Sequence, residues 1–288
     1  MFRFHERPDP TAFEASGPLN DARDEIRRIY EAALPSFASD EDRIAFPKKV
    51  LGKSSDHWKG FKEVFSDAQH GRCGYCDVVV VGTQFCDVEH FRPKGEVEIL
   101  DTAKQGKEQD NLSNVKGRKA LRTIGTGYWW EAYSWKNYLL SCEVCNRTWK
   151  RSYFPVNFDP MLRTRPVEGV PEDELLFHPF EDEEPLNHFR YELDGRIRGI
   201  SPMGVATIET VGLWRPSLVI QRKKKLATLA RLIDEMLAPS ASNELVRSHV
   251  RTILELGSDD ANNFPGMTRV FWAQVSKMSW EQLKELNE

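Results

Sequence analysis

The chain has 288 residues, and its 40 Lys and Arg against 44 Asp and Glu give a formal net charge of −4. This charge argues against a histone-like binder that is positive over its whole surface, although a local basic patch could still contact nucleic acid. No apolar run approaches the roughly 20 residues that a membrane-spanning helix needs, and the polar N-terminus does not resemble a signal peptide. We therefore expect a cytoplasmic protein, either an enzyme or a binding module.

The first part of the chain, residues 1–70, is predicted to be helical. Apolar side chains recur there at helical spacing in two stretches, and the simplest interpretation is that both stripes face a core. These side chains are Ile26, Ile29, Ala33 and Leu34, followed by Trp58, Phe61 and Phe65.

Residues 71–160 change in character and are predicted to form a module of strands and helix. A Cys-x-x-Cys turn leads into Val78–Val81, a Gly-Thr turn and Gln84–Val88, which together predict a β-hairpin. The segment Asp101–Gly127 is rich in Lys, Gln, Asn and Gly, and we expect it to be a mobile loop inserted into the module. A second Cys-x-x-Cys is expected to open a helix.

The last part, residues 161–288, is predicted to be mainly helical. A polar hairpin is expected around Asp194-Gly195, and amphipathic helices follow it. The clearest helix starts near Pro216, a residue type favoured in the first helical turn. Its apolar positions are Leu218, Leu226, Leu229, Leu232, Ile233 and Leu237. The predicted fold class is therefore α+β.

Four of the five cysteines form two pairs of equal spacing, Cys73-Gly-Tyr-Cys76 and Cys142-Glu-Val-Cys145. Each pair can present two thiolates to one tetrahedral ion. Buried cysteines without a metal are the alternative, but two matched pairs in a reducing compartment favour zinc. We predict a structural zinc with no vacant coordination position, so this zinc should not be catalytic. Cys86 lacks a matching partner and is assigned to packing.

The segment between the two cysteine pairs carries the residue types that phosphodiester hydrolysis needs. That reaction requires a base to activate water, a divalent cation and cationic groups that hold the phosphate. The run Asp87-Val-Glu89-His90 supplies carboxylates and a base, and strand alternation places Asp87 and Glu89 on one face, with His90 on the other side or at the strand end. A basic Arg-Pro-Lys tail follows.

At this point the chain resembles the HNH endonucleases, which are built around a ββα-metal finger. The match consists of Glu89-His90, Asn137 and Asn146, framed by the cysteine pairs. The resemblance implies that His90 is the general base and that Glu89 and Asn146 bind a catalytic magnesium or similar ion. Asn137 would brace the loop and His90 through hydrogen bonds. Asp87 remains an alternative carboxylate ligand.

A narrower resemblance is to the PtuB-type HNH nucleases of the Septu anti-phage system and related retrons, and it covers roughly residues 58–225. It implies a nucleic-acid substrate and a PtuA-type ATPase as partner. Two positions depart from the family pattern. Asn146 replaces the His that names the motif, and an amide oxygen favours a hard cation such as magnesium. Trp214 stands where we expect Asn in a Gly-Leu-Asn-Arg run, and the sequence offers no mechanistic explanation.

Other charged and aromatic residues have two possible interpretations. Lys94, Arg147, Lys150 and Arg151 could contact phosphates or simply be solvated. The basic run Gln221–Lys225 fits a solvated helix face better than a nucleic-acid patch. The tryptophans at positions 129, 130 and 135 are expected to pack in a core.

Two other functions remain possible from the sequence. One is a zinc-stabilised module that binds nucleic acid or protein without cleavage, although an intact set of catalytic residues argues against it. The other is a stand-alone HNH restriction enzyme whose C-terminal helices read the substrate.

Overall fold

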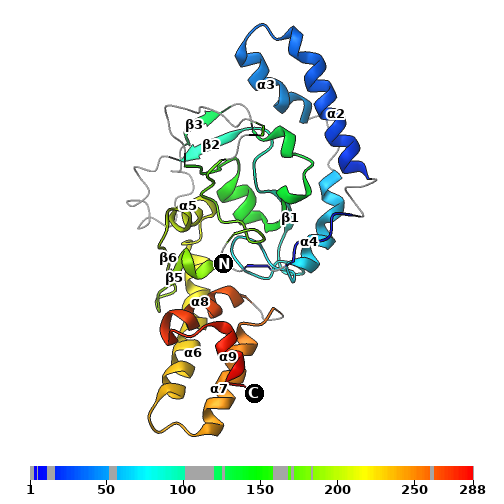
Figure 1. The fold of residues 1–288 in the computed structure, drawn as a ribbon. Coiled ribbons are helices and arrows are strands. Elements are labelled where there is room, and N and C mark those ends of the chain that lie inside the picture. The colour runs from blue at the N-terminus through cyan, green and yellow to red at the C-terminus, as the bar shows by residue number, and fades with distance from the viewer. Residues whose placement is uncertain are drawn as a thin grey trace.

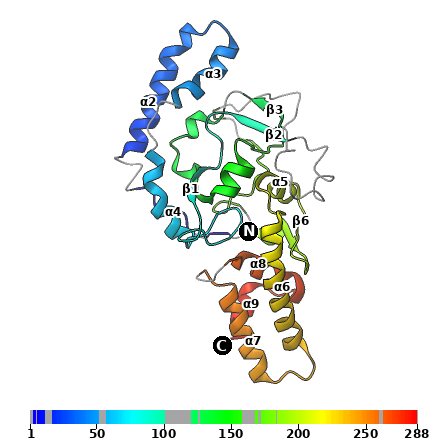
Figure 2. The ribbon, with the colours of Figure 1, turned by 180° about the vertical axis from the view of Figure 1, so that it is seen from behind.

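The computed structural model describes residues 3–4, 6–11, 17–51, 57–100, 120–124, 127–157, 168–169, 172–182, 184–259 and 263–287. The molecule is elongated (Figure 1). Helices α2 (Pro18–Ala33) and α3 (Asp40–Leu51) lie at one end, and strand β1 (Cys86–His90) lies in the middle. Helices α6 (Pro216–Leu237) and α7 (Asn243–Leu256) form the other end, and the view from behind gives the same order (Figure 2). Within the described ranges, no helix is long and apolar enough to cross a membrane.

The N-terminal region is helical, as the apolar spacing predicts. Its elements are α2 (Pro18–Ala33), η1 (Leu34–Ser36), α3 (Asp40–Leu51), η2 (His57–Phe61) and α4 (Lys62–Ala68). Trp58, Phe61 and Phe65 are buried, so the second stripe faces the core as expected. In the first stripe Ile26 is buried, but the expectation is wrong for Leu34, which is 37% exposed. The ring centroid of Phe65 lies 4.7 Å from that of Trp135, which fixes α4 against the central part of the chain.

The central sheet joins two segments that are far apart in the sequence. Strand β1 (Cys86–His90) pairs antiparallel with β4 (Tyr138–Cys142), with Cys86 opposite Cys142 and His90 opposite Tyr138. The chain then continues from Glu143 into η7 (Val144–Lys150), a π-helix. The helix predicted after the second cysteine pair is thus present, in a rare geometry that is frequent at functional sites.

The hairpin predicted from Val78–Val81 and Gln84–Val88 is wrong. Val79 forms an isolated bridge with Arg72, and the amides of Val80 and Val81 donate to the carbonyl of Gly71. The first cysteine turn therefore folds the valine segment back onto its own start. The β1 segment is left to pair with β4 instead.

A second small sheet joins β2 (Val97–Leu100) antiparallel to β3 (Ala120–Ile124). Strand β3 lies inside the segment that the sequence predicts to be a loop, so that prediction is wrong for these five residues. The rest of the predicted mobile loop that precedes β3 lies outside the described residues. The expectation failed because β3 is a short strand within a polar segment, where apolar alternation gives little signal.

Among the residues described, the C-terminal region contains a short 3-10 helix, η8 (Pro185–Asn187), followed by a hairpin and five α-helices. They are β5 (Phe189–Tyr191), β6 (Ile197–Gly199), α5 (Pro202–Val211), α6 (Pro216–Leu237), α7 (Asn243–Leu256), α8 (Pro265–Ser276) and α9 (Trp280–Glu285). The predicted hairpin around Asp194-Gly195 and the helix from Pro216 are both confirmed. Leu237 is an exception to the predicted core stripe, since 60% of it is exposed.

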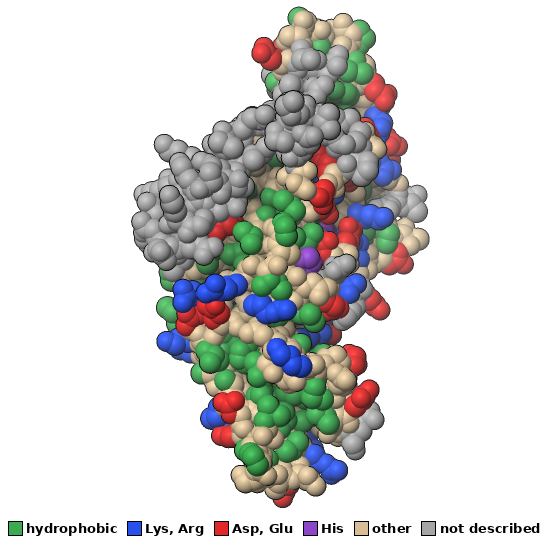
Figure 3. Space-filling model, turned by 60° about the vertical axis from the view of Figure 1, so that its left-hand side comes forward, with side chains coloured by type: hydrophobic (Ala, Val, Ile, Leu, Met, Phe, Trp, Pro, Cys, Tyr) green, Lys and Arg blue, Asp and Glu red, His purple; other side chains and the backbone are tan. Residues whose placement is uncertain are grey.

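The predicted basic run on α6 is divided between the surface and the interior. Lys223 and Lys224 are exposed, whereas Arg222 is buried and donates to the carbonyl of Leu213. The ammonium of Lys225 donates to the carbonyls of Leu256 and Asn263. On the face shown in Figure 3, basic and acidic side chains are interspersed, and hydrophobic ones gather over its lower half. This run is therefore not a continuous basic surface.

One hydrophobic cluster extends from the N-terminal helices through the cysteine pairs to the C-terminal helices.

Within this cluster, η7 packs closely against the corner that joins α5 to α6. Gly212 ends α5 at a φ of +61°, and the ring of Trp149 lies directly against it. Trp214 packs edge to face on the same ring, with centroids 5.0 Å apart. This packing gives Trp214 a structural role, which the sequence did not reveal.

Gly212→Ala is expected to destabilise the protein strongly. A Cβ atom at this position would lie 2.1 Å from the nearest ring atom of Trp149. Overpacking typically costs about 1–3 kcal/mol, and a positive φ adds about 1–2 kcal/mol. Gly82→Ala is the matched control, because Gly82 has a φ of +74° and a Cβ atom there would meet no other atom within 4 Å. Urea unfolding should therefore show the larger loss for Gly212→Ala. Equal losses would contradict the described contact.

Candidate functional site

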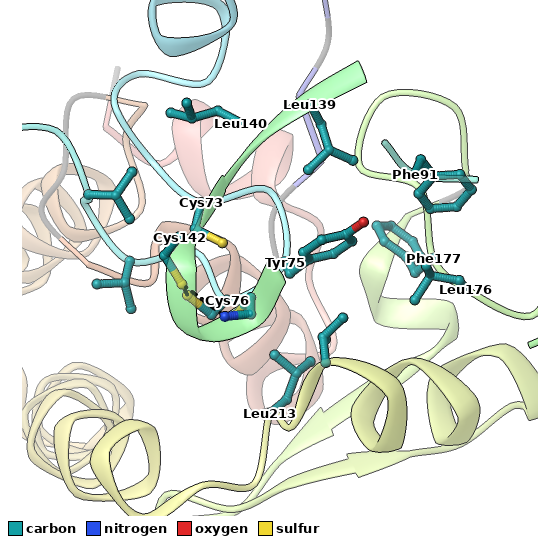
Figure 4. Packing of buried hydrophobic residues seen from close by; sticks show 14 of the residues in the cluster. Cys73, Tyr75, Cys76, Phe91, Leu139, Leu140, Cys142, Leu176, Phe177 and Leu213 are labelled. Carbon is teal, nitrogen blue, oxygen red and sulfur yellow. Dashed lines mark hydrogen bonds between the residues drawn. The ribbon is translucent and has the colours of Figure 1, made fainter. Parts of the chain in front are cut away.

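The four paired cysteines come together in space. The sulfurs of Cys73, Cys76, Cys142 and Cys145 all lie within 4.8 Å of one another, and all four residues are buried. The sulfurs of Cys76 and Cys142 are 4.0 Å apart (Figure 4). Zinc–sulfur bonds of about 2.3 Å place tetrahedral sulfurs about 3.8 Å apart. The cluster therefore fits a tetrahedral zinc ion, while Cys86 is buried outside it, as predicted.

Local hydrogen bonds hold each cysteine pair in a tight turn. The amide of Cys73 donates to the carbonyl of Val78, and Asp77 takes a positive φ of 63°, so the chain turns tightly around the first pair. In the second pair, the amide of Cys145 donates to the sulfur of Cys142. Burial raises the pKa of the Cys145 thiol well above its ordinary value. Burial of a thiolate is costly, and a zinc ion bound by the four sulfurs would offset this cost.

The predicted base, His90, stands at the end of β1 in an aromatic setting. Its ring contacts those of Trp58 and Tyr138 edge to face, with centroids 4.8 and 5.2 Å away. Its Nε2 atom lies 2.9 Å from the carbonyl oxygen of Ala132. A carbonyl can only accept, so we assign the proton to Nε2, which leaves Nδ1 as the proton acceptor. Burial, followed by the charge of Lys94, lowers the pKa of His90 well below its ordinary value, which keeps the ring neutral.

The predicted metal ligand Glu89 is held in a buried ion pair. Its carboxylate lies 2.6 Å from the ammonium of Lys150, which also donates to the carbonyl of His90 at 2.9 Å. Burial raises the pKa of Glu89, and the charge of Lys150 opposes this shift. Asp87 lies nearer the surface and pairs with Arg147 at 2.5 Å. Both carboxylates thus face η7, as the strand alternation predicts.

Asn137 sits at the entrance to β4 and binds three backbone groups. Its amide nitrogen donates to the carbonyls of Arg92 and Glu131, each at 3.0 Å, and its oxygen accepts from the amide of Arg92 at 2.6 Å. These bonds join the segment after β1 to the segment before β4. The bonds expected to brace the loop are thus present, but among the described residues none joins the Asn137 side chain to His90. Its part in catalysis remains a prediction.

Asn146 lies in η7, about one turn before Lys150, and is partly exposed. Its carbonyl accepts from the amide of Arg151. Within the described part of the chain, no hydrogen bond engages its side-chain amide, so the amide oxygen is available to a ligand. The structure thus brings Glu89 against the helix that carries Asn146, while the ring of His90 faces the aromatic side of β1.

The four cations considered as phosphate contacts lie in different environments. Lys150 is buried against Glu89, so the interpretation of this residue as a solvated surface lysine is wrong. Arg147 and Arg151 have side chains 63% and 51% exposed; Arg147 pairs with the exposed carboxylate of Asp87, and Arg151 pairs with the largely buried carboxylate of Glu98. The ammonium of Lys94 lies 3.4 Å from the centroid of the Trp58 ring. Lys150 and Glu89 are far apart in the sequence, so no local sequence pattern predicts that they pair in the interior.

Sequence comparison supports the resemblance to PtuB. The chain is 30% identical over 213 residues to the Septu protein PtuB of Bacillus mycoides, an alignment that covers 69% of this chain and 65% of that protein. The match thus spans slightly less than two thirds of the length of that relative. No protein-family model matches the chain. The chain is therefore related to a Septu protein, while its assignment to the HNH nucleases remains a prediction.

Proposed function

We propose that the protein is a metal-dependent nuclease of the HNH type. The observation that carries this proposal is the arrangement on β1, β4 and η7. There, the backbone carbonyl of Ala132 orients the neutral ring of His90, and the adjacent Glu89 faces the helix that carries Asn146. An antiparallel strand pair followed by a helix that carries Asn146 supports the interpretation of this region as a ββα-metal finger.

The proposed chemistry assigns a task to each side chain. His90 accepts a proton from water through Nδ1, and the bond from Nε2 to Ala132 fixes the direction in which this acceptor points. Asn137 holds the backbone on both sides of the site. Among the surface cations, Arg147 and Arg151 can contact the phosphate backbone.

The donor set of Glu89 and Asn146 suits a hard divalent cation such as magnesium, since both side chains offer oxygen. Magnesium usually binds through one or two protein carboxylates plus water and phosphate oxygens, so few protein ligands suffice. A bound ion would neutralise charge that develops on the phosphate. Because Lys150 already contacts Glu89, the ion would share this carboxylate with an ammonium group.

We also propose a role in anti-phage defence together with a PtuA-type ATPase. The similarity to the Septu protein PtuB supports this role, and the alignment covers 65% of that relative.

The test is incubation of the pure protein with plasmid DNA and with total RNA, in magnesium or EDTA, with and without a PtuA-type ATPase. We expect cleavage of at least one substrate in magnesium and none in EDTA. Binding without cleavage in every arm would instead support the zinc-stabilised binding module. Sequence-specific cleavage by the protein alone would support a stand-alone restriction enzyme.

A further inference from the structure

An arginine from the C-terminal region reaches the cysteine cluster. Arg215 precedes the first residue of α6, and only 8% of it is exposed. Its Nη2 atom donates to the sulfur of Cys145 at 3.3 Å, and Nη1 donates to the carbonyls of Val211 and Gly212 at 3.2 and 3.1 Å. The planar guanidinium thus spans one sulfur and the carbonyl end of α5.

Charge explains why a cation belongs here. Four thiolates around one zinc ion carry a net charge of −2, and the cluster is buried, so water does not screen this charge. Arg215 brings a positive charge and a hydrogen-bond donor to the same sulfur. Lysine could supply the charge, but its single ammonium lacks the planar fork that reaches both the sulfur and the two carbonyls.

The same corner of the chain also contacts η7. Gly212 and Trp214 pack against Trp149, which lies in η7 between Asn146 and Lys150. Cys145 is itself a residue of η7. The corner that joins α5 to α6 therefore touches this helix both at a predicted zinc ligand and at its aromatic side chain.

We propose that Arg215 is an outer-sphere partner of the zinc site, which slows zinc release and ties the corner between α5 and α6 to η7. Partners that hydrogen-bond to metal ligands typically change metal affinity about 10–100-fold. The proposal rests on the zinc site and does not depend on nuclease activity.

The test is zinc release from the full-length protein to a chromogenic chelator. We expect Arg215→Met to release zinc about tenfold faster or more, and Arg215→Lys to fall between this variant and the wild type. Arg231→Met is the matched control, because Arg231 lies on α6, the helix that Arg215 precedes, but pairs with Glu235 at the surface. Its release rate should equal that of the wild type.

Cobalt substitution separates an effect on the sulfur from a general loss of stability. Removing a hydrogen bond from a thiolate raises the energy of its lone pairs, so the sulfur-to-cobalt charge-transfer band of Arg215→Met should move to longer wavelength. A wild-type release rate and an unshifted band in this variant would overturn the proposal. If Arg215→Met does not fold, Arg215→Gln, which keeps an N–H donor without the charge, should still release zinc faster than the wild type, and a wild-type release rate in that variant would overturn the proposal.

Discussion

Removal of zinc is expected to unfold the central module, residues 71–160, and not merely to slow a reaction. The purified protein should carry about one tightly bound zinc ion per chain. Four-thiolate zinc sites contribute about 10 kcal/mol or more to folding, which is comparable to the total stability of a typical domain, about 5–15 kcal/mol. Cys73→Ser and Cys145→Ser should therefore be insoluble or readily digested by protease.

Cys86→Ser is the matched control for this prediction. Cys86 is buried in β1 but is not a member of the four-cysteine cluster. This variant should keep its zinc and resist protease nearly as well as the wild type. Metal analysis that finds no zinc in a folded protein with cooperative thermal unfolding would contradict the zinc site.

Loss of cleavage in Asn146→Ala should be partly reversed by metal, whereas loss in His90→Ala should not. Removal of a general base typically costs about a hundredfold or more in rate, and removal of a metal ligand can be equally severe. More magnesium or manganese can refill a weakened metal site, but it cannot replace a proton acceptor. Cleavage rates measured over a range of metal concentrations should show this difference, with zinc content unchanged in both variants.

His249→Ala serves as the control for the histidine. His249 lies on α7 and contacts Glu235, far in sequence from the candidate site. Its cleavage rate should match that of the wild type. Rescue of His90→Ala by manganese, or no rescue of Asn146→Ala at any concentration, would show that the two roles are assigned wrongly.

The cysteine cluster could be predicted from the sequence because each pair is a local feature. A Cys-x-x-Cys turn brings its own two sulfurs together, so the fold only had to join the two turns. The valine segment after the first pair illustrates the opposite case. Its four β-branched valines favour a strand, but Gly71 and Arg72 are its hydrogen-bonding partners in the structure, and the predicted hairpin does not form. Strand partners depend on tertiary structure, which local preference does not determine.

The ion pair of Lys150 and the contact of Arg215 could not be predicted for a related reason. A charged side chain near a turn is usually solvated, and only the packed fold shows that these two are buried beside Glu89 and Cys145. The packing of Trp214 could not be predicted either, because its partner Trp149 lies 65 positions earlier in the sequence. The four cysteines were therefore predictable as a set, whereas the buried contacts of Lys150 and Arg215 were not, and the catalytic roles of Glu89, His90 and Asn146 stay predictions.

The most direct test of the proposed nuclease is a comparison of wild-type protein and His90→Ala, each loaded with zinc, on whichever nucleic acid the wild type cuts. The carbonyl of Ala132 orients His90, and we assign proton transfer to this side chain. We predict magnesium-dependent cleavage by the wild type and a rate at least about a hundredfold lower for the variant, with equal zinc content. Full activity of His90→Ala would contradict the assignment of this residue as the general base.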